Sequence, residues 1–224
     1  MAHTDPPATR RRILAAAGAL FAERGFRAAT MREIAQRARV NLAAAHYHFG
    51  SKQALYLEVV SGEFEKLEKR LAARGAGPGA ALDALSRGEL EELLRRRVDT
   101  MLETVLDAAS VHGAIMQREM TDPSEALPVI VKQFIDPQRR AMERLVARLA
   151  PALSQAEIER CTRSLVGQIF FYLTHRAALL LLMGRSRYPR GHTREAAGHI
   201  TEFSLGGLER LAAEHREGRA RHAS

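Results

Sequence analysis

Side chains suited to binding DNA are concentrated between residues 30 and 52 of this chain. Asn41 precedes the alanine-rich segment LAAAHY. An asparagine amide can form two hydrogen bonds with adenine, and alanine or leucine can contact the methyl group of thymine. Contacts with base edges are therefore predicted for Asn41, Leu42, Ala43, Ala44 and His46. Because few of these side chains are polar, we expect DNA shape and bridging water molecules to add to the specificity.

The same stretch offers hydroxyl groups, ring N–H groups and positive charges, all of which can bind phosphate. Such contacts fix the position of a protein on DNA without reading its base sequence. The hydroxyl of Thr30 lies at a predicted helix N-terminus, where unpaired backbone N–H groups favour an anion. Phosphate contacts are predicted for Thr30, Tyr47, His48 and Lys52, with Arg32, Arg37 and Arg39 adding positive charge.

Two short helices joined by a tight turn are predicted to position these side chains. Glu33 follows Thr30 at the spacing of a capping box, which marks the start of the first helix. Apolar residues then recur at helical spacing, at Met31, Ile34, Ala35 and Ala38. Val40 is an apolar residue in the turn, and Asn41 is a good N-cap for a second helix at Leu42–Tyr47. The pattern predicts a helix-turn-helix, whose second helix enters the major groove of DNA.

Each of these residues also has an ordinary structural interpretation. Thr30, Asn41 and Ser51 would cap helices in any helical protein. Tyr47 and Phe49 could both be core residues, and for Phe49 this is the main interpretation. His46 and His48 could suggest a metal site, but residues two apart lie on different faces of a helix, and no metal is expected. The combined pattern therefore carries the prediction.

Composition and charge limit the classes of function that remain. The chain has 224 residues and a net charge of +8. Residues 1–60 contain nine basic and four acidic residues, so most of the positive charge lies near the start. This favours an anionic partner, nucleic acid or membrane surface. A membrane-surface protein would need a strongly basic amphipathic helix, whereas the helical segments here mix both signs. An enzyme would need a nucleophile or acid–base set, and the sequence has no such motif, so no enzyme and no cofactor are expected.

The location in the cell is predicted from cysteine content and apolar runs. The single cysteine, Cys161, cannot form an intrachain disulfide, which fits a reducing cytosol. We read it as a small buried residue rather than a redox sensor. The polar, arginine-rich beginning is not a secretory signal. The longest apolar run, residues 165–183, is interrupted by Gln168, His175 and Arg176, which argues against a membrane span. We therefore expect a cytoplasmic protein.

The remaining segments have the helical period, so the fold is predicted to be all-α. Gly25 should end a first helix over 7–24, and Ser51 should cap a connecting helix over 51–74. Residues 75–81 are a glycine-rich break. Further helices are expected over 90–105, 110–120, 127–149 (interrupted at Pro128 and Pro137), 157–183 and 193–213 (capped by Thr193). The expected domains are a DNA-binding domain at 1–52 and a larger helical domain at 75–224.

Two long motifs resemble the TetR family of bacterial transcriptional regulators. They are ILAAAGALFAERGF at residues 13–26 and TMREIAQRARVNLAAAHYHFGSKQALY at residues 30–56. Three later segments, QREMTDPSEAL, FIDPQ and GQIFFYLTHR, are similar to the C-terminal domain of CecR-like regulators. Two positions depart from the family pattern. Arg39 replaces a small residue, often glycine, so the turn either lacks a positive φ or is strained, and His46 replaces a frequent tyrosine.

The resemblance implies a homodimeric, ligand-responsive regulator, in which a small-molecule effector releases a repressor from a palindromic operator. The alternative that we keep is a non-specific architectural DNA-binding protein. The family places both an effector pocket and the dimer interface in the C-terminal domain. Pocket candidates are soft or polar residues among apolar neighbours: Met101, His112, Met116, Gln117, Phe134, Phe171 and His175. Interface candidates on the last two long helices are Leu165, Ile169, Tyr172, Ile200, Phe203, Leu208 and Leu211.

For both sets the alternative is ordinary core packing. A metal or acid–base set of His112, Glu119 and His175 would require the fold to bring these three residues together.

Overall fold

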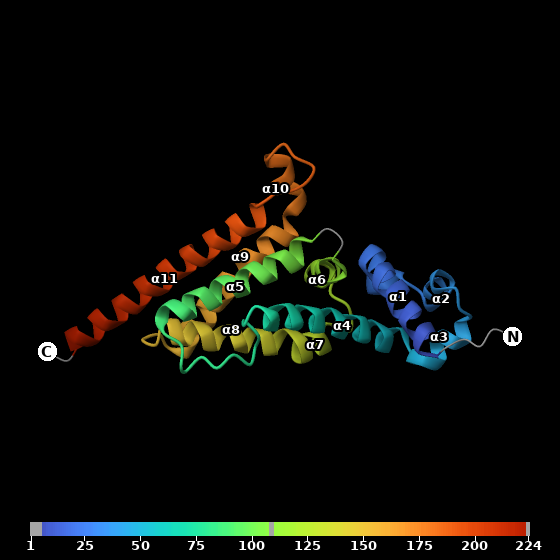
Figure 1. Ribbon diagram of the computed structural model, residues 1–224, viewed down its shortest axis with the longest axis horizontal. Coiled ribbons are helices and arrows are strands. Elements are labelled where there is room, and N and C mark those ends of the chain that lie inside the picture. Colours follow the sequence, from blue (N-terminus) through green and yellow to red (C-terminus); the bar gives the residue numbers. More distant parts are fainter. Residues whose placement is uncertain (1–5, 108–109, 223–224) are drawn as a thin grey trace. The chain divides into compact units, whose positions relative to one another are not determined.

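The structure, a computed structural model, describes residues 6–107 and 110–222, and all regular secondary structure in these ranges is helical (Figure 1). The prediction of an all-α fold is therefore confirmed. The elements are α1 (Pro6–Ala28), α2 (Met31–Ala38), α3 (Leu42–Phe49), α4 (Lys52–Ala73), α5 (Arg87–Leu106), α6 (Val111–Thr121), α7 (Leu127–Ile130), the π-helix η1 (Val131–Ile135), α8 (Asp136–Leu149), α9 (Gln155–Thr174), α10 (Arg176–Leu182) and α11 (His192–His222).

The described chain divides into two compact units. The first contains residues 6–66 and 110–134, and the second contains residues 67–107 and 135–222. The units therefore cut the chain within α4, and α6 belongs to the first unit although it follows α5 in sequence. Compactness does not test function, so the functional division into 1–52 and 75–224 stays a prediction.

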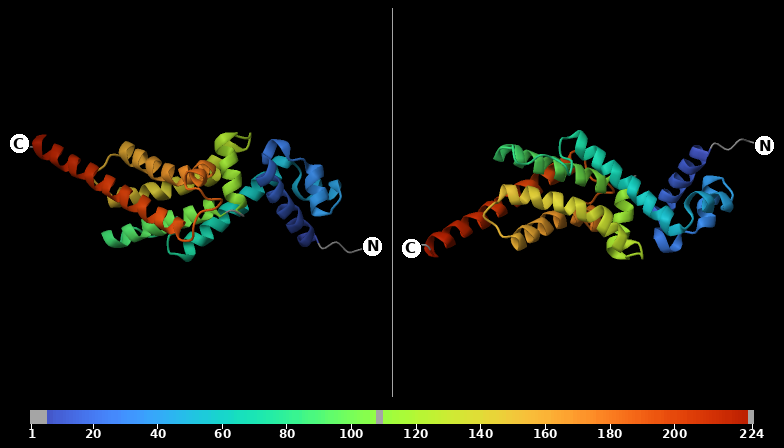
Figure 2. Two further views of the ribbon diagram at one scale, coloured as in Figure 1. Left: turned by 90° about the horizontal axis from the view of Figure 1, so that it is seen from above. Right: turned by 90° about the horizontal axis from the view of Figure 1, so that it is seen from below.

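The first unit is built around α1, which packs against α2, α3 and α6 (Figure 2). Its helical stripe is buried, with Ile13, Ala17 and Phe21 fully inaccessible. Gly25 has φ 80° and ψ 172°, so the backbone leaves the helical conformation there, as predicted for the end of the first helix. Phe26 then packs against the rings of Phe21 and Tyr56, with centroid distances of 6.3 and 4.9 Å.

Side-chain caps begin the helices after α1, as the sequence predicts. The Thr30 hydroxyl accepts a hydrogen bond from the Glu33 amide, and the Glu33 carboxylate accepts one from the Thr30 amide. The Asn41 Oδ1 accepts the Ala44 amide at 2.6 Å, and the Ser51 hydroxyl accepts the Ala54 amide at 3.0 Å. These short polar contacts determine where α2, α3 and α4 begin.

The second unit contains α5, α8, α9 and α11, which pack on one another (Figure 1). Its core consists of inward-facing apolar residues, among them Leu94, Val98, Leu102, Leu145 and Ile169. The interruption predicted near Pro137 is confirmed, because the π-helix η1 separates α7 from α8, whereas Pro128 lies in the first turn of α7 and interrupts no helix. A capping box formed by Ser154 and Glu157 begins α9.

Two predicted boundaries in the second unit are wrong. The run over 157–183 is not one helix, because α9 ends at Thr174 and α10 follows after a bend of 71° at His175. There the Thr174 hydroxyl bonds to the Phe170 carbonyl and the His175 ring. The last helix begins at His192 rather than after a Thr193 cap, because Gly191, with φ 85°, turns the chain earlier and its carbonyl accepts the Glu195 amide.

No single helix in the described ranges is long and apolar enough to cross a membrane. Only α9 and α10 taken together reach that length and hydropathy, and they are bent by 71°.

Candidate DNA-binding surface

Helix α3, the predicted recognition helix, has one buried face and one exposed face. Ala45 and Phe49 are buried with exposed fractions of 0% and 7%. On the other face Leu42 is 38% exposed and Tyr47 is 86% exposed. An aromatic side chain with this exposure contributes little to the protein core, and aromatic residues are enriched where proteins contact partners. The predicted base-contacting residues Asn41, Leu42, Ala43 and His46 are exposed, and Ala44 is half-buried.

The polar groups of α3 are partly committed within the helix. The Oδ1 of Asn41 already accepts the Ala44 amide, so a bidentate contact with adenine would use its second lone pair. The Nδ1 of His46 lies 3.0 Å from the carbonyl oxygen of Gly50. Because a carbonyl can only accept, Nδ1 carries the hydrogen, and the neutral ring presents Nε2 as an acceptor. His46 can therefore accept a hydrogen bond from a base amino group.

The side chains predicted to bind phosphate differ in how far they are already engaged in contacts within the protein. The Thr30 hydroxyl donates to Glu33 at 2.8 Å, so a phosphate would compete with that carboxylate. The pKa of Glu33 is lowered, mainly by this hydrogen bond and that from the Thr30 amide. The Lys52 ammonium lies 4.4 Å from the Phe26 ring centroid and 3.3 Å from the Arg27 carbonyl. Tyr47 is exposed and His48 is half-buried.

The arginines of α2 and its turn fall into two groups. Arg37 forms two hydrogen bonds with Glu23, both of 2.7 Å, and the resulting bidentate pair lowers the pKa of Glu23. Its charge is therefore largely neutralised. Arg32 and Arg39 are exposed and form no ion pair within the described ranges. Arg39 has φ 54° and ψ 48°, so the turn has a positive φ on a residue with a side chain. Of the two alternatives drawn from the sequence, the strained turn is the one observed.

Comparisons with known proteins decide the family. Residues 13–59 match the family described as bacterial regulatory proteins, tetR family. Residues 90–208, more than half of the chain, match the C-terminal domain of the HTH-type transcriptional dual regulator CecR. The chain belongs to the TetR family. Members of this family are DNA-binding transcription regulators and not enzymes, which confirms both predictions.

Individual relatives of this TetR-family chain agree with that assignment. The HTH-type transcriptional dual regulator CecR of Shigella flexneri is 29% identical over 188 residues, which cover 82% of this chain and 84% of the relative. The HTH-type transcriptional repressor KstR2 of Rhodococcus jostii is 36% identical over 37% of this chain and 46% of the relative. The crystal structure of AibR in complex with isovaleryl coenzyme A and operator DNA has the same fold, with a TM-score of 0.62, 16% identity and coverage of 89% and 97%.

The predicted effector-pocket residues are distributed over both units of the TetR-family chain. His112 and Phe134 lie in the first unit, each against the ring of Phe64, with centroid distances of 4.8 and 5.3 Å. Met116 is buried beside them on α6, whereas Gln117 is exposed. Phe64 on α4 is therefore the centre of this aromatic cluster.

In the second unit Phe171 is 47% exposed and stacks on the exposed ring of His175 at 4.6 Å, and Met101 is half-buried. Within the first unit, the Glu119 carboxylate accepts hydrogen bonds from the Tyr56 hydroxyl and the Ser124 amide. No group of three possible metal ligands occurs in the part of the chain that the structure describes.

The predicted interface residues differ in their exposure within one protomer, and the interface itself stays a prediction. Four of them have exposed fractions of 5% or less and belong to the core of the second unit: Leu165, Ile169, Ile200 and Leu208. A side chain already buried inside one protomer has little surface left for a partner. Phe203 and Leu211 remain exposed at 67% and 36%, and Tyr172 is half-buried.

Cys161, which the sequence predicts to be buried, is half-buried, and desolvation raises the pKa of its thiol.

Sequence reasoning missed a set of contacts that α6 and the turn after it make with α1. Arg118 donates to the Ala22 carbonyl at 3.1 Å and also to the Glu23 carbonyl. Arg27 donates to the Asp122 carboxylate at 2.7 Å and to the Pro123 carbonyl at 2.9 Å. Three of these residues lie in the segment QREMTDPSEAL, but the spacing of that segment gives no indication of its distant partners.

Proposed function

We propose that this TetR-family regulator is a homodimeric repressor that binds a palindromic operator and is released by a small-molecule effector. The observation that carries the DNA-contacting part of the proposal is the exposed face of α3, above all Tyr47 at 86% exposure. Asn41, Leu42 and His46 would contact bases, while Tyr47 and Lys52 would contact phosphates. The unpaired charges of Arg32 and Arg39 would add sequence-independent attraction.

A dimer is supported by the surface formed by α9 and α11. Phe171, Phe203 and Leu211 expose apolar area there. Two grooves between the helices have volumes of about 310 and 540 Å³. Small residues line these grooves and allow a partner helix to approach closely: Ser164, Gly167, Ser204 and Gly207. A two-fold dimer through this surface would match the two-fold symmetry of a palindrome.

Effector release is supported by the contacts of α6 with α1 and α4. Arg118, Arg27 and Glu119 connect α6 and the turn after it to the DNA-binding helices through hydrogen bonds and an ion pair. An effector that displaced α6 would therefore also displace α1 and the recognition helix. To release DNA it must bind the non-binding arrangement more tightly than the binding one. The aromatic cluster of Phe64 on α4, His112 on α6 and Phe134 on η1 is a candidate effector contact.

Two of the comparisons support a repressor that responds to an effector. One relative described as a repressor matches part of the chain, and an AibR structure contains both an acyl coenzyme A and operator DNA. We extend the sign of regulation and the existence of an effector from those proteins to this chain. The effector is expected to be a small organic molecule, and its chemical class is left to experiment.

Selection of bound sites from a random DNA pool at near-physiological salt tests this function. An enriched palindrome is expected, with half-sites about one helical turn or a little more apart. Binding without enrichment would favour the architectural alternative, which needs only positive charge. A reporter gene placed behind the selected site then tests the sign of regulation, since a repressor must lower expression.

A further inference from the structure

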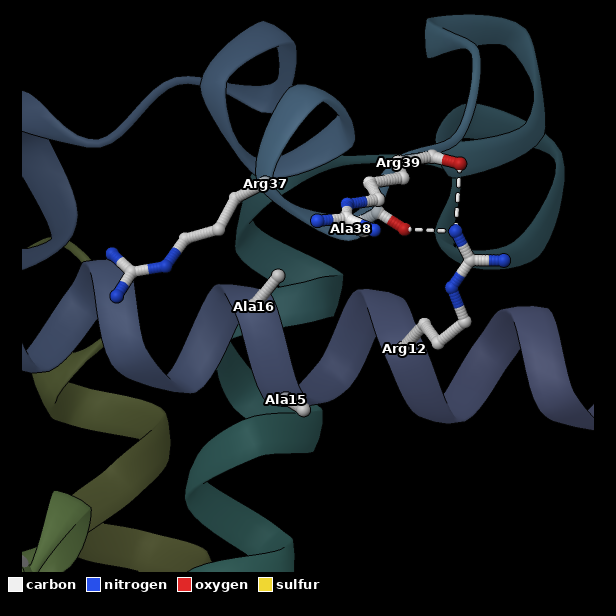
Figure 3. A pocket seen from close by; sticks show the side chains of 6 residues that line it. All are labelled: Arg12, Ala15, Ala16, Arg37, Ala38 and Arg39. Carbon is white, nitrogen blue, oxygen red and sulfur yellow. Dashed lines mark hydrogen bonds between the residues drawn. The ribbon is translucent and has the colours of Figure 1, made fainter.

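Arg12 on α1 makes two hydrogen bonds that the DNA contacts above do not use. One nitrogen of its guanidinium group donates to the carbonyl oxygens of Ala38 and Arg39, the second at 2.7 Å (Figure 3). Ala38 is the last residue of α2, and Arg39 lies in the turn before α3. Carbonyl groups at a helix C-terminus lack partners within the helix, so a side-chain donor stabilises them there. Arg12 therefore contacts the backbone of the turn directly.

That turn has an unfavourable conformation. Arg39 is the one described residue other than glycine with a positive φ, at 54°. A side chain in the left-handed region is disfavoured relative to glycine, which adopts it freely. The α3 cap at Asn41 follows two residues later, so the direction in which α3 begins depends on the conformation at Arg39. Without an external contact this turn would occupy other conformations more often.

We propose that Arg12 is a positioning residue for the recognition helix. By binding the carbonyls of Ala38 and Arg39, it stabilises the left-handed turn and presents α3 in its DNA-binding orientation. A glycine at position 39 would adopt this conformation freely. With arginine at that position, the contact from Arg12 supplies the stabilisation instead. The inference rests on α3 as the DNA-contacting helix and is independent of the operator, the effector and the sign of regulation.

The alternative is that Arg12 contacts a DNA phosphate. Arg12, Arg37 and Arg39 line a shallow hollow of about 350 Å³ between α1 and α2, together with three alanines (Figure 3). However, Arg37 is paired with Glu23, and the hydrogen bonds of Arg12 go to the two backbone carbonyls. The positioning role depends on hydrogen bonds that the structure contains. For the phosphate role, a DNA phosphate would have to compete with the two carbonyls for the Arg12 guanidinium group.

Salt dependence of DNA binding separates the two roles. Arg12→Ala is compared with Arg11→Ala, which removes the same charge from a neighbouring exposed residue without a hydrogen bond or ion pair in the described ranges. The probe is a duplex of the selected palindrome. For a positioning residue, Arg12→Ala lowers affinity about three- to tenfold with no change in the slope of log K against log salt. A slope reduced by about one unit would identify a phosphate contact and overturn the proposal.

Substitutions at Arg39 test the reason for the positioning role. Arg39→Gly and Arg39→Ala remove the same charged side chain, but only glycine relieves the left-handed strain. In the Arg39→Ala background, Arg12→Ala should still lower affinity about three- to tenfold. In the Arg39→Gly background, the same change should cost less than about twofold, because the turn no longer needs the contact. An equal loss in both backgrounds would contradict the proposal.

Amide hydrogen exchange provides a readout that needs no DNA. The Val40 amide donates to the Ala35 carbonyl at 3.0 Å and reports the closed turn. Its exchange should accelerate in Arg12→Ala but not in Arg11→Ala, and Arg39→Gly should restore protection. Unchanged exchange in Arg12→Ala would overturn the positioning role even if the selection yields a palindrome. If the selection fails, the exchange result still decides the role of Arg12, and affinity is measured on a mixed-sequence duplex.

A conservative variant keeps the test decisive if Arg12→Ala does not fold. Arg12→Lys retains the charge but replaces the planar guanidinium fork with a point charge. A positioning role predicts faster Val40 exchange and weaker binding in this variant. A phosphate contact would tolerate it, and wild-type exchange with wild-type affinity would contradict the proposal.

Discussion

Tyr56 on α4 donates a hydrogen bond of 2.6 Å to the carboxylate of Glu119 on α6, and both side chains are 2% exposed. The other carboxylate oxygen of Glu119 accepts the Ser124 amide at 3.1 Å. Burial and the hydrogen bond to Glu119 raise the pKa of Tyr56 well above its ordinary value, so the phenol donates its hydrogen at any physiological pH. This buried pair connects α4 to the helix proposed to respond to the effector.

Tyr56→Phe should lower the free energy of unfolding by about 1–3 kcal/mol, because it leaves a carboxylate oxygen buried without its donor. The measurement is chemical denaturation at neutral pH. Leu55→Val, a trimming of an adjacent and equally buried side chain, controls for general disturbance of α4. In a double-mutant cycle with Glu119→Gln, the two changes should not be additive. Additive losses would show that the contribution of the Tyr56 hydroxyl does not depend on the negative charge of Glu119.

Tyr47→Ala should weaken DNA binding about tenfold, since a hydrogen bond to a charged phosphate is lost, while the free energy of unfolding changes by less than about 0.5 kcal/mol. The reason is the 86% exposure of Tyr47, which leaves it few contacts within the protein. Binding is followed by fluorescence anisotropy and stability by a thermal melt. Phe49→Ala on the buried face of the same helix should instead lower stability. Wild-type affinity in Tyr47→Ala would remove this residue from the interface.

Lys52→Ala should weaken binding to all DNA sequences about equally and reduce the salt slope by about one unit, if its ammonium group contacts phosphate. The side chain also lies over the Phe26 ring, so a small loss of stability is expected as well. Lys66→Ala, which removes an exposed lysine from the same helix, should leave the slope unchanged. If both variants retain the wild-type slope, Lys52 acts only by packing on Phe26.

Phe203→Asp should convert dimers to monomers, because it places a charge in the apolar surface of α9 and α11. Light scattering measures the mass in solution. Val131→Asp, at a 42% exposed apolar position outside these helices, should remain dimeric. An intact dimer in Phe203→Asp would place the interface elsewhere.

Leu165→Ala, a core change at a 2% exposed position, should lower the free energy of unfolding by about 2–5 kcal/mol whether or not dimers persist.

Glu157→Gln should make the second unit less stable above about pH 4.5 and have little effect near pH 2. Hydrogen bonds from the Ser154 hydroxyl and amide, and then from His215, lower the pKa of Glu157 to about 2. A depressed folded-state pKa means that its stabilising contribution is complete above the unfolded-state value of 4.5 and is lost as the pH falls toward 2. Urea denaturation across this range measures it. Glu159→Gln, on the same turn of α9, should lack this dependence, and a pH-independent difference would contradict the assignment.

The sequence by itself determined the fold class, the helix-turn-helix and most helix starts. These features depend on interactions between residues three or four apart, such as the capping contacts of Thr30 with Glu33 and of Asn41 with the Ala44 amide. The DNA-contacting residues of α3 stay a prediction from the same local pattern, and the exposure of Leu42 and Tyr47 is compatible with it.

Only the tertiary structure decided which groups act on one another over longer distances. The positive φ of Arg39 stayed open in the sequence, because the donor that stabilises the turn, Arg12, lies 27 residues earlier. Likewise, periodicity placed Leu165 and Phe203 on apolar stripes, but packing against neighbouring helices decided that one is buried and the other exposed. The pairing of Tyr56 with Glu119 joins residues 63 apart, and no local pattern encodes it. Local spacing fixes how a helix begins and which way its residues point, whereas packing of distant segments decides which partner each residue meets.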